Sequence, residues 1–377
     1  MRRTGAWRFI CRCLAAGEDP DARRDAAAAI RAGRVGWERV VEIASEYWVT
    51  AALYWELRET GLASLLPGDV LEYFEAIYEM NSARNAGIAG HAGELAGLLN
   101  GIGVAPLLLK GAGNLVSGRY PDPGVRIMDD IDILVPEDRA LECWRLLESA
   151  GYRTGAANAH LDVAVLSGQG WPYLTRTGRT GVVELHRLSE WPDMMGCPEL
   201  YMDCRTLELP GGQVRVLDTT GCLMITLAHA YVSHGAGRLA TAPVRSLYDA
   251  ALLMRRAGGE IAWQRVIDTF GRAGQMQALS AACFLLERLL GKRPPAAIPR
   301  PRYAWAWWQR CLLNVEKPWI PLMHCRLGIN LQMARKALGR TKEGKLLRRG
   351  MGTVRVPLRK LRTALRICTT RVEGSWK

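Results

Sequence analysis

Two aspartates separated by a single residue are the residues of this sequence best suited to metal chemistry. Asp130 and Asp132 lie within residues 128–135, where the apolar neighbours predict a buried strand. Side chains at positions i and i+2 of a strand share a face, so the two carboxylates project together while Ile131 and Ile133 enter the core. Such a pair repels itself unless a cation lies between, and Mg²⁺ favours these oxygen ligands. An isolated pair of this kind more often faces solvent, so a metal site is indicated only if neighbouring residues also suit one.

Three neighbouring features favour a site over a solvated pair. Glu184 stands in the middle of the apolar strand 182–186, where either a third metal ligand or an outward-facing position explains a charge. Lys110 and Gly111 follow an apolar run at a predicted strand-to-helix turn, which suits phosphate, although a solvated lysine is the plainer explanation. Arg126 precedes the aspartate strand and is placed to contact a triphosphate in a bidentate manner.

The elements that must position these residues form a predicted α/β unit of about 110 residues. The pattern predicts strands over 104–109, 131–135, 162–166 and 182–186, helices over 112–117 and 139–150, and a Pro/Gly-rich loop over 120–126. Helical periodicity precedes and follows this unit, with helices predicted over 220–233, 244–257, 261–271 and 275–290. We therefore predict four regions: an N-terminal helical region (1–100), a core (101–217), a helical domain (218–295), and an aromatic segment with a basic tail (296–377).

The ordered motifs resemble the uncharacterised nucleotidyltransferase family of the DNA polymerase β superfamily. The resemblance rests on residues 109–112, 120–126, 130–135 and 183–186, and extends over about residues 40–295. It implies an α+β fold with a polymerase-β-like core, a small mixed sheet with helices, flanked by N- and C-terminal helical regions. Most members of the superfamily open the phosphate helix with a Gly-Ser pair, whereas this chain has a Lys-Gly pair there.

The resemblance also implies roles for individual residues and an activity. Asp130 and Asp132 would hold two metal ions, Mg²⁺ or Mn²⁺, and Glu184 would complete the triad. The triphosphate of a nucleoside triphosphate donor would contact Lys110, Gly111, Arg126 and, one helical turn along, Asn114. The expected enzyme is a metal-dependent nucleotidyltransferase (EC 2.7.7 type, ATP-binding) that moves a nucleoside monophosphate, most simply AMP, to a hydroxyl of a small molecule, peptide or protein. Two alternatives stay open: a transferase that moves a phosphoryl or sugar group, and a binding module whose carboxylates have no catalytic role and whose basic C-terminal tail engages RNA or a protein partner.

Four other polar residues near the motifs have simple structural explanations. His186 shares the face of Glu184 and is a lesser candidate for catalysis, while His229 lies in an apolar helix and suits a hydrogen-bonded core position. Asp129 should point away from its neighbours as a solvated or loop residue. Asp249 should form a local salt bridge, with a nucleotide contact as the lesser possibility.

Composition excludes several classes of protein and places the positive charge. No apolar run approaches the roughly 18–20 residues of a membrane span, and ten scattered cysteines indicate reduced thiols. We therefore expect a cytoplasmic protein. Residues 326–377 carry fifteen Arg and Lys against two Glu, which accounts for the whole net charge of +13. This amphipathic tail suits an anionic partner such as RNA, a membrane surface or an acidic peptide, or else docks on the chain itself.

Overall fold

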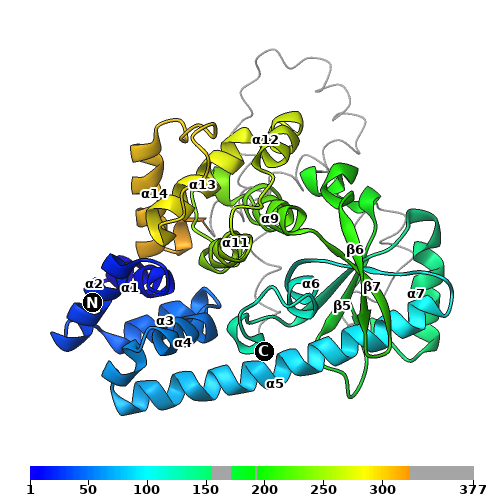
Figure 1. Cartoon of the computed structure of the whole chain (residues 1–377), viewed down its shortest axis with the longest axis horizontal. Helices are drawn as coiled ribbons and strands as arrows, with labels where there is room; N and C mark the ends of the chain where they lie inside the picture. The colour runs from blue at the N-terminus through cyan, green and yellow to red at the C-terminus, as the bar shows by residue number, and fades with distance from the viewer. Residues whose placement is uncertain (155–170, 192, 322–377) are drawn as a thin grey trace, which may run out of the picture. The chain divides into compact units, whose positions relative to one another are not determined.

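The N-terminal part of the chain is a group of helices that ends in one very long helix. The computed structural model describes residues 1–154, 171–191 and 193–321. Its first helices are α1 (Arg3–Ala15), α2 (Pro20–Arg31), α3 (Trp37–Glu46), α4 (Thr50–Glu59) and α5 (Gly68–Asn100). Helix α5 has 33 residues, which span about 50 Å. It runs from α3 and α4 to the sheet, and so joins the helical part of the molecule to the strands (Figure 1).

Within the described residues, a mixed sheet of seven strands carries the aspartate pair. Its order is β3-β4-β5-β2-β1-β7-β6. The strands are β1 (Leu107–Leu108), β2 (Asp130–Leu134), β3 (Arg153–Thr154), β4 (Leu174–Thr175), β5 (Val182–His186), β6 (Cys204–Leu209) and β7 (Gly212–Leu217). Strand β2 is parallel to β5 and antiparallel to β1, and β1 is parallel to β7. Helix α6 (Lys110–Val116) packs on β2, and α7 (Ala140–Ser149) packs on β5. The expected α+β class with a mixed sheet and flanking helices is confirmed.

The predicted strands agree with the structure at the centre of the sheet and depart from it elsewhere. Strand β5 has the predicted bounds, and β2 begins one residue early. Of the strand predicted over 104–109, only residues 107–108 pair with neighbours. The strand predicted over 162–166 lies outside the described residues. The hairpin of β6 and β7 was not predicted, because β6 is mostly polar and exposed and shows no buried apolar face.

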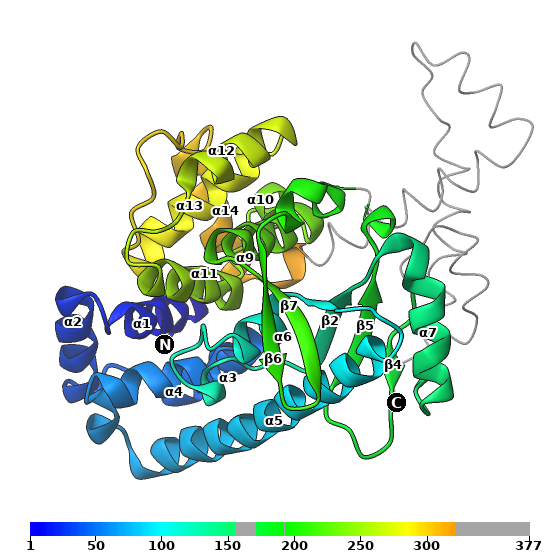
Figure 2. The same ribbon diagram turned by 45° about the vertical axis from the view of Figure 1, so that its right-hand side comes forward.

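The β6–β7 hairpin lies against α5, and glycines make this approach possible (Figure 2). A Cβ atom on Gly93 would lie 2.2 Å from the carbonyl oxygen of Pro210, and one on Gly97 would lie 2.4 Å from that of Gly211. Neither backbone can move away without separating the helix from the sheet. The small residues of α5 therefore set the distance between these two elements.

The C-terminal helices pack back onto the N-terminal ones. They are α9 (Thr219–Ala228), α10 (Ala236–Leu239), α11 (Val244–Arg256), α12 (Trp263–Arg272), α13 (Met276–Leu290) and α14 (Ala304–Glu316), with a π-helical turn at His229–Ser233 after α9. The predicted helices over 220–233, 244–257, 261–271 and 275–290 are confirmed. Trp308 of α14 packs near Trp7 of α1, with ring centroids 6.1 Å apart. The buried Glu56 of α4 accepts a hydrogen bond of 2.7 Å from the Tyr248 hydroxyl of α11.

The structure of the described residues can be compared with the predicted regions, the state of the cysteines and the expected lack of a membrane span. Residues Met1–Glu316 form one compact unit. The division into four regions stays a prediction, and the basic tail from residue 326 onward lies outside the described residues. Each of the eight cysteines within the described ranges is a free thiol. In the same ranges, none of the helices combines the length and apolarity that crossing a membrane requires.

The contact between α5 and the hairpin yields a test of the fold. We expect Gly93→Ala to lower the thermal unfolding midpoint, because overpacking against a backbone that cannot move costs about 1–3 kcal/mol. The matched control is Gly90→Ala in the same helix, where a Cβ atom would meet nothing within 4 Å. There alanine should stabilise by about 0.5–1 kcal/mol. Equal midpoints for the two variants, measured by circular dichroism, would show that the hairpin does not hold this position on α5.

Candidate active site

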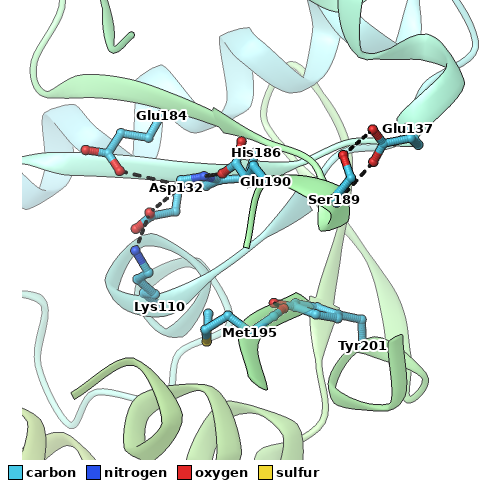
Figure 3. A network of polar contacts seen from close by, with 9 residues as sticks. All are labelled: Lys110, Asp132, Glu137, Glu184, His186, Ser189, Glu190, Met195 and Tyr201. Atoms are coloured by element: carbon cyan, nitrogen blue, oxygen red, sulfur yellow. Dashed lines mark hydrogen bonds and ion pairs between the residues drawn. The ribbon is translucent and has the colours of Figure 1, made fainter. Parts of the chain in front are cut away.

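The central pair of parallel strands places two of the predicted metal ligands side by side. Asp132 of β2 is the register partner of Glu184 of β5. Ile131 and Val183 are fully buried on the opposite side of the alternation, so the acidic side chains share one face of the sheet. Figure 3 shows the carboxylates of Asp132 and Glu184 together with the imidazole of His186 on this face. The sheet register thus brings together residues from two separate motifs.

Asp132 is a buried carboxylate held by two cationic partners. Its side chain is 1% exposed, and its Oδ1 atom accepts hydrogen bonds from Lys110 Nζ at 2.6 Å and His186 Nε2 at 2.9 Å. Burial by itself would raise the pKa of Asp132, but the charge of Lys110 and the hydrogen bond from His186 outweigh it. The pKa therefore lies well below its usual range. Because a buried charge is unfavourable without partners, this carboxylate calls for positive charge beside it.

Lys110 reaches Asp132 from the first residue of α6. Its backbone has φ +48°, a value uncommon for residues other than glycine. The amide of the preceding Leu109 donates to the carbonyl oxygen of Asp132 at 3.0 Å, which ties the start of α6 to β2. A Cβ atom on Gly111 would lie 3.1 Å from Met128 Sδ, so an alanine there would require the Met128 side chain to shift slightly. Backbone strain of this kind is concentrated at functional sites.

Asp130 lies at the start of β2 within the same electrostatic field. Burial and the negative charge of Asp132 raise the pKa of the Asp130 carboxyl group, while the charge of Lys110 opposes the rise. Asp130 is therefore the carboxyl group of the pair whose charge is least well balanced. A divalent cation near it would relieve this repulsion. The exposed Asp129 lies outside this cluster, as expected for a loop residue.

Arg126 is held next to the aspartate strand by groups from two helices. Its Nε atom donates to Asp249 Oδ2 of α11 at 2.7 Å. Asn81 and Asn85 of α5 donate to its carbonyl oxygen at 3.1 and 2.8 Å. Burial by itself would lower the pKa of Arg126, but the carboxylate of Asp249 outweighs it and raises the pKa. The expectation of a local salt bridge for Asp249 was wrong in its partner, which lies 123 residues away rather than in the same helix.

His186 takes a larger part in the site than the sequence suggested. Its Nε2 atom lies 3.5 Å from Glu184 Oε2 as well as 2.9 Å from Asp132, and its Nδ1 atom is hydrogen-bonded to Glu190. Burial by itself would lower the pKa of His186, but the three carboxylates outweigh it and raise the pKa well above 6.5. Trp191 covers the imidazole at a centroid distance of 4.8 Å. Both ring nitrogens of His186 and the Trp191 ring thus hold the imidazole in place.

Glu190 is the residue of this cluster that sequence reasoning missed. Its side chain is 3% exposed, and its partner His186 stands four residues earlier. A spacing of four residues signals a contact in a helix, but His186 ends a strand and Glu190 ends a short 3₁₀ turn, Leu188–Glu190. The local pattern therefore contained no usable signal.

Asn114 and His229, the two other polar residues considered, differ in their hydrogen bonding. Asn114 is 2% exposed inside α6, and its Oδ1 atom has no hydrogen-bond partner among the described residues; its phosphate contact stays a prediction. His229 is hydrogen-bonded as expected, through its Nε2 atom to that of His234 at 3.0 Å, but it is only half-buried. Burial, followed by the positive charge of Lys110, lowers the pKa of His229 to about 3. A neutral histidine pair therefore borders the lysine.

The side chains on this face fit a divalent metal ion. Asp132, Glu184 and His186 each offer a ligand atom, and these atoms lie within 4.8 Å of one another. Two carboxylates and an imidazole can bind Mg²⁺, Mn²⁺ or Zn²⁺, with affinities that differ from metal to metal. The ammonium group of Lys110 rests on Asp132 at 2.6 Å, where it supplies positive charge to the same oxygen. Asp130 stands outside this tight group, and the ligand roles of all three acidic residues stay predictions.

Comparisons with known proteins point to one family. The sequence profile of a family described as uncharacterised nucleotidyltransferase matches residues 33–291. Among solved structures, the chain is similar to an antigenic nucleotidyltransferase-like protein from Paracoccidioides brasiliensis, with 16% identity and a TM-score of 0.36, over 56% of this chain and 95% of that chain. No protein of curated function is significantly similar to the chain in sequence.

The Glu190–His186 contact yields a test of the metal site. We expect Glu190→Gln to weaken Mn²⁺ binding by about 10- to 100-fold, as removal of a carboxylate behind a ligating histidine does elsewhere. The affinity can be measured on the full chain by electron paramagnetic resonance titration.

Glu137→Gln is the matched control for this test. Glu137 also contacts the 188–190 turn, through Ser189, but its side chain is 50% exposed and it does not touch His186. Its Mn²⁺ affinity should equal that of the unmodified chain. Unchanged affinity in the Glu190 variant as well would remove His186 from the metal site.

Proposed function

Because the chain belongs to the uncharacterised nucleotidyltransferase family, we propose that it is a metal-dependent enzyme that moves AMP from ATP to a hydroxyl group. The observation that carries this proposal is the placement of Asp132 and Glu184 on register partners of one sheet, with Lys110 on the buried carboxylate. The acceptor would be a small molecule, a peptide or a protein.

The reaction would form one bond and break one. An acceptor hydroxyl oxygen would attack the α-phosphorus of ATP, and the bond from that phosphorus to the bridging oxygen of the β-phosphate would break. Pyrophosphate would leave, and the hydroxyl proton would pass to a carboxylate. Bound Mg²⁺ or Mn²⁺ would supply charge stabilisation for the hydroxyl and for the leaving pyrophosphate.

The acidic residues and His186 would bind the metal and meet the acceptor. Asp130, Asp132 and Glu184 would hold the metal, with His186 as a further candidate ligand. Glu184 is the carboxylate best placed to meet an acceptor, since its side chain is 40% exposed whereas that of Asp132 is 1% exposed.

The cations would serve the donor. Lys110 has a flexible stem and a single ion-pair partner among the described residues, so it can turn from Asp132 to a phosphate when a metal neutralises that carboxylate. Arg126 is less free, since Asp249 holds its Nε atom, but a guanidinium has five N–H groups and only two of its nitrogens are engaged here. We propose that both contact the triphosphate.

The test follows the α-phosphate label of ATP. We incubate the full chain with Mn²⁺, α-³²P-ATP and fractionated cell extract, and we expect label to appear in an acceptor. Asp130→Asn and Asp132→Asn should each reduce labelling by at least about 100-fold, the scale on which charge stabilisation acts in such sites. Asp129→Asn, one position away in an exposed loop, is the matched control and should label normally.

Two outcomes would contradict the proposal in different ways. Transfer of α-label that survives Asp130→Asn combined with Asp132→Asn would show that another site does the chemistry. Label that moves only from γ-³²P-ATP would show phosphoryl transfer in place of nucleotidyl transfer.

A further inference from the structure

Trp48 occupies a backbone position that a tryptophan fits poorly. Helix α3 ends in a Schellman motif: the Val49 amide donates to the Ala44 carbonyl oxygen at 2.8 Å, and the Trp48 amide donates to that of Ser45 at 3.0 Å. The residue in this position must be left-handed, and Trp48 has φ +57°. Glycine is the usual occupant, because a Cβ atom is unfavourable there.

The side chain of Trp48 is not buried in the apolar core. It is 43% exposed, which makes it one of the few large apolar residues that are not covered. The left-handed backbone lowers stability, and the aromatic contact of the ring within the described residues is with the guanidinium of Arg245, so packing in the apolar core does not explain a tryptophan here. Strain that the fold does not need is a reason to look for a function.

Arg245 connects Trp48 with the aspartate strand. Its guanidinium carbon lies 5.4 Å from the centre of the Trp48 ring. Its Nη1 atom lies 3.4 Å from the carbonyl oxygen of Ile127, which also accepts a hydrogen bond from Arg126. The indole, the two guanidinium groups and the segment that enters β2 are therefore neighbours.

The charge of Arg245 is only partly balanced. Within the described part of the chain Arg245 forms no ion pair, although the charges of Asp249 and Asp130 act on it from a greater distance. Arg245 also lies in the first turn of α11, which has no acidic residue, and the helix dipole disfavours a cation at that end. Burial and the positive charge of Arg126 lower the pKa of Arg245. An anion beside Arg245 would relieve each of these unfavourable interactions.

We propose that Trp48 and Arg245 form the donor subsite, in which the indole stacks on the nucleobase and the guanidinium contacts the polyphosphate of a nucleoside triphosphate. This rests on the proposed function, and it adds two residues from outside the sheet. The α3–α4 turn supplies the base contact and α11 supplies the phosphate contact. Because an aromatic ring stacks on any base, the subsite favours nucleotides over bare polyphosphate without choosing strongly among bases.

The test separates the base contact from the phosphate contact. The full chain is titrated with α,β-methylene-ATP and with inorganic tripolyphosphate, each with Mg²⁺, by calorimetry. Trp48→Gly should weaken binding of the nucleotide by about tenfold, the scale of one aromatic–base stack, and leave tripolyphosphate binding unchanged. Arg245→Gln should weaken binding of both ligands.

Stability and a matched aromatic variant guard this test against misfolding. Trp48→Gly relieves the left-handed strain, so its thermal midpoint should be no lower than that of the unmodified chain. Trp48→Phe should restore most of the nucleotide affinity. Trp305→Ala, at a tryptophan 75% exposed on α14, should change neither affinity.

The outcomes distinguish this inference from the function on which it rests. If the unmodified chain binds neither ligand, the proposed nucleotide transfer itself fails and the subsite with it. If it binds α,β-methylene-ATP and Trp48→Gly binds equally well, the transferase proposal stands and the base contact is overturned. Equal weakening of both ligands by Trp48→Gly would also overturn it, because the ring would then act on the phosphates.

Discussion

The buried charge of Asp132 is the constraint around which the site is organised. A carboxylate that is 1% exposed needs positive partners, and each of them comes from a different element: Lys110 from the start of α6 and His186 from the end of β5. His186 is held in turn by Glu190, and the register of β2 and β5 sets Glu184 beside the same carboxylate. The buried charge of Asp132 is therefore stabilised by groups from three places: the sheet, helix α6 after β1, and the turn after β5.

The position of Arg126 depends instead on the helices. Arg126 stands between α5, whose asparagines hold its backbone, and Asp249 of α11, which holds its guanidinium. Helix α11 is joined to the N-terminal helices through Glu56, and it carries Arg245 toward Trp48. The helical parts that flank the sheet are therefore not a separate support. They hold Arg126 and Arg245 against the segment that leads into the aspartate strand, and Arg245 in turn contacts the Trp48 ring.

Sequence reasoning recovered most of the elements and part of the site. The strands predicted over 131–135 and 182–186 were found because they are short apolar runs, and the later helices because their apolar residues recur at helical spacing. The β6–β7 hairpin was missed because β6 is mostly polar and exposed and has no buried apolar face. Glu190 was missed because its spacing from His186 has meaning only in a helix, and no helix lies there.

The sequence by itself determined which residues could do chemistry and which face of each strand they occupy, since both follow from residue type and the two-residue period of a strand. It also determined the family to which the chain belongs. Only the tertiary structure decided the pairing: Asp132 with Glu184, Asp132 with a histidine 54 residues away, and Arg126 with an aspartate 123 residues away. No local pattern encodes such contacts, because they depend on the register of strands and on how distant helices pack against the sheet.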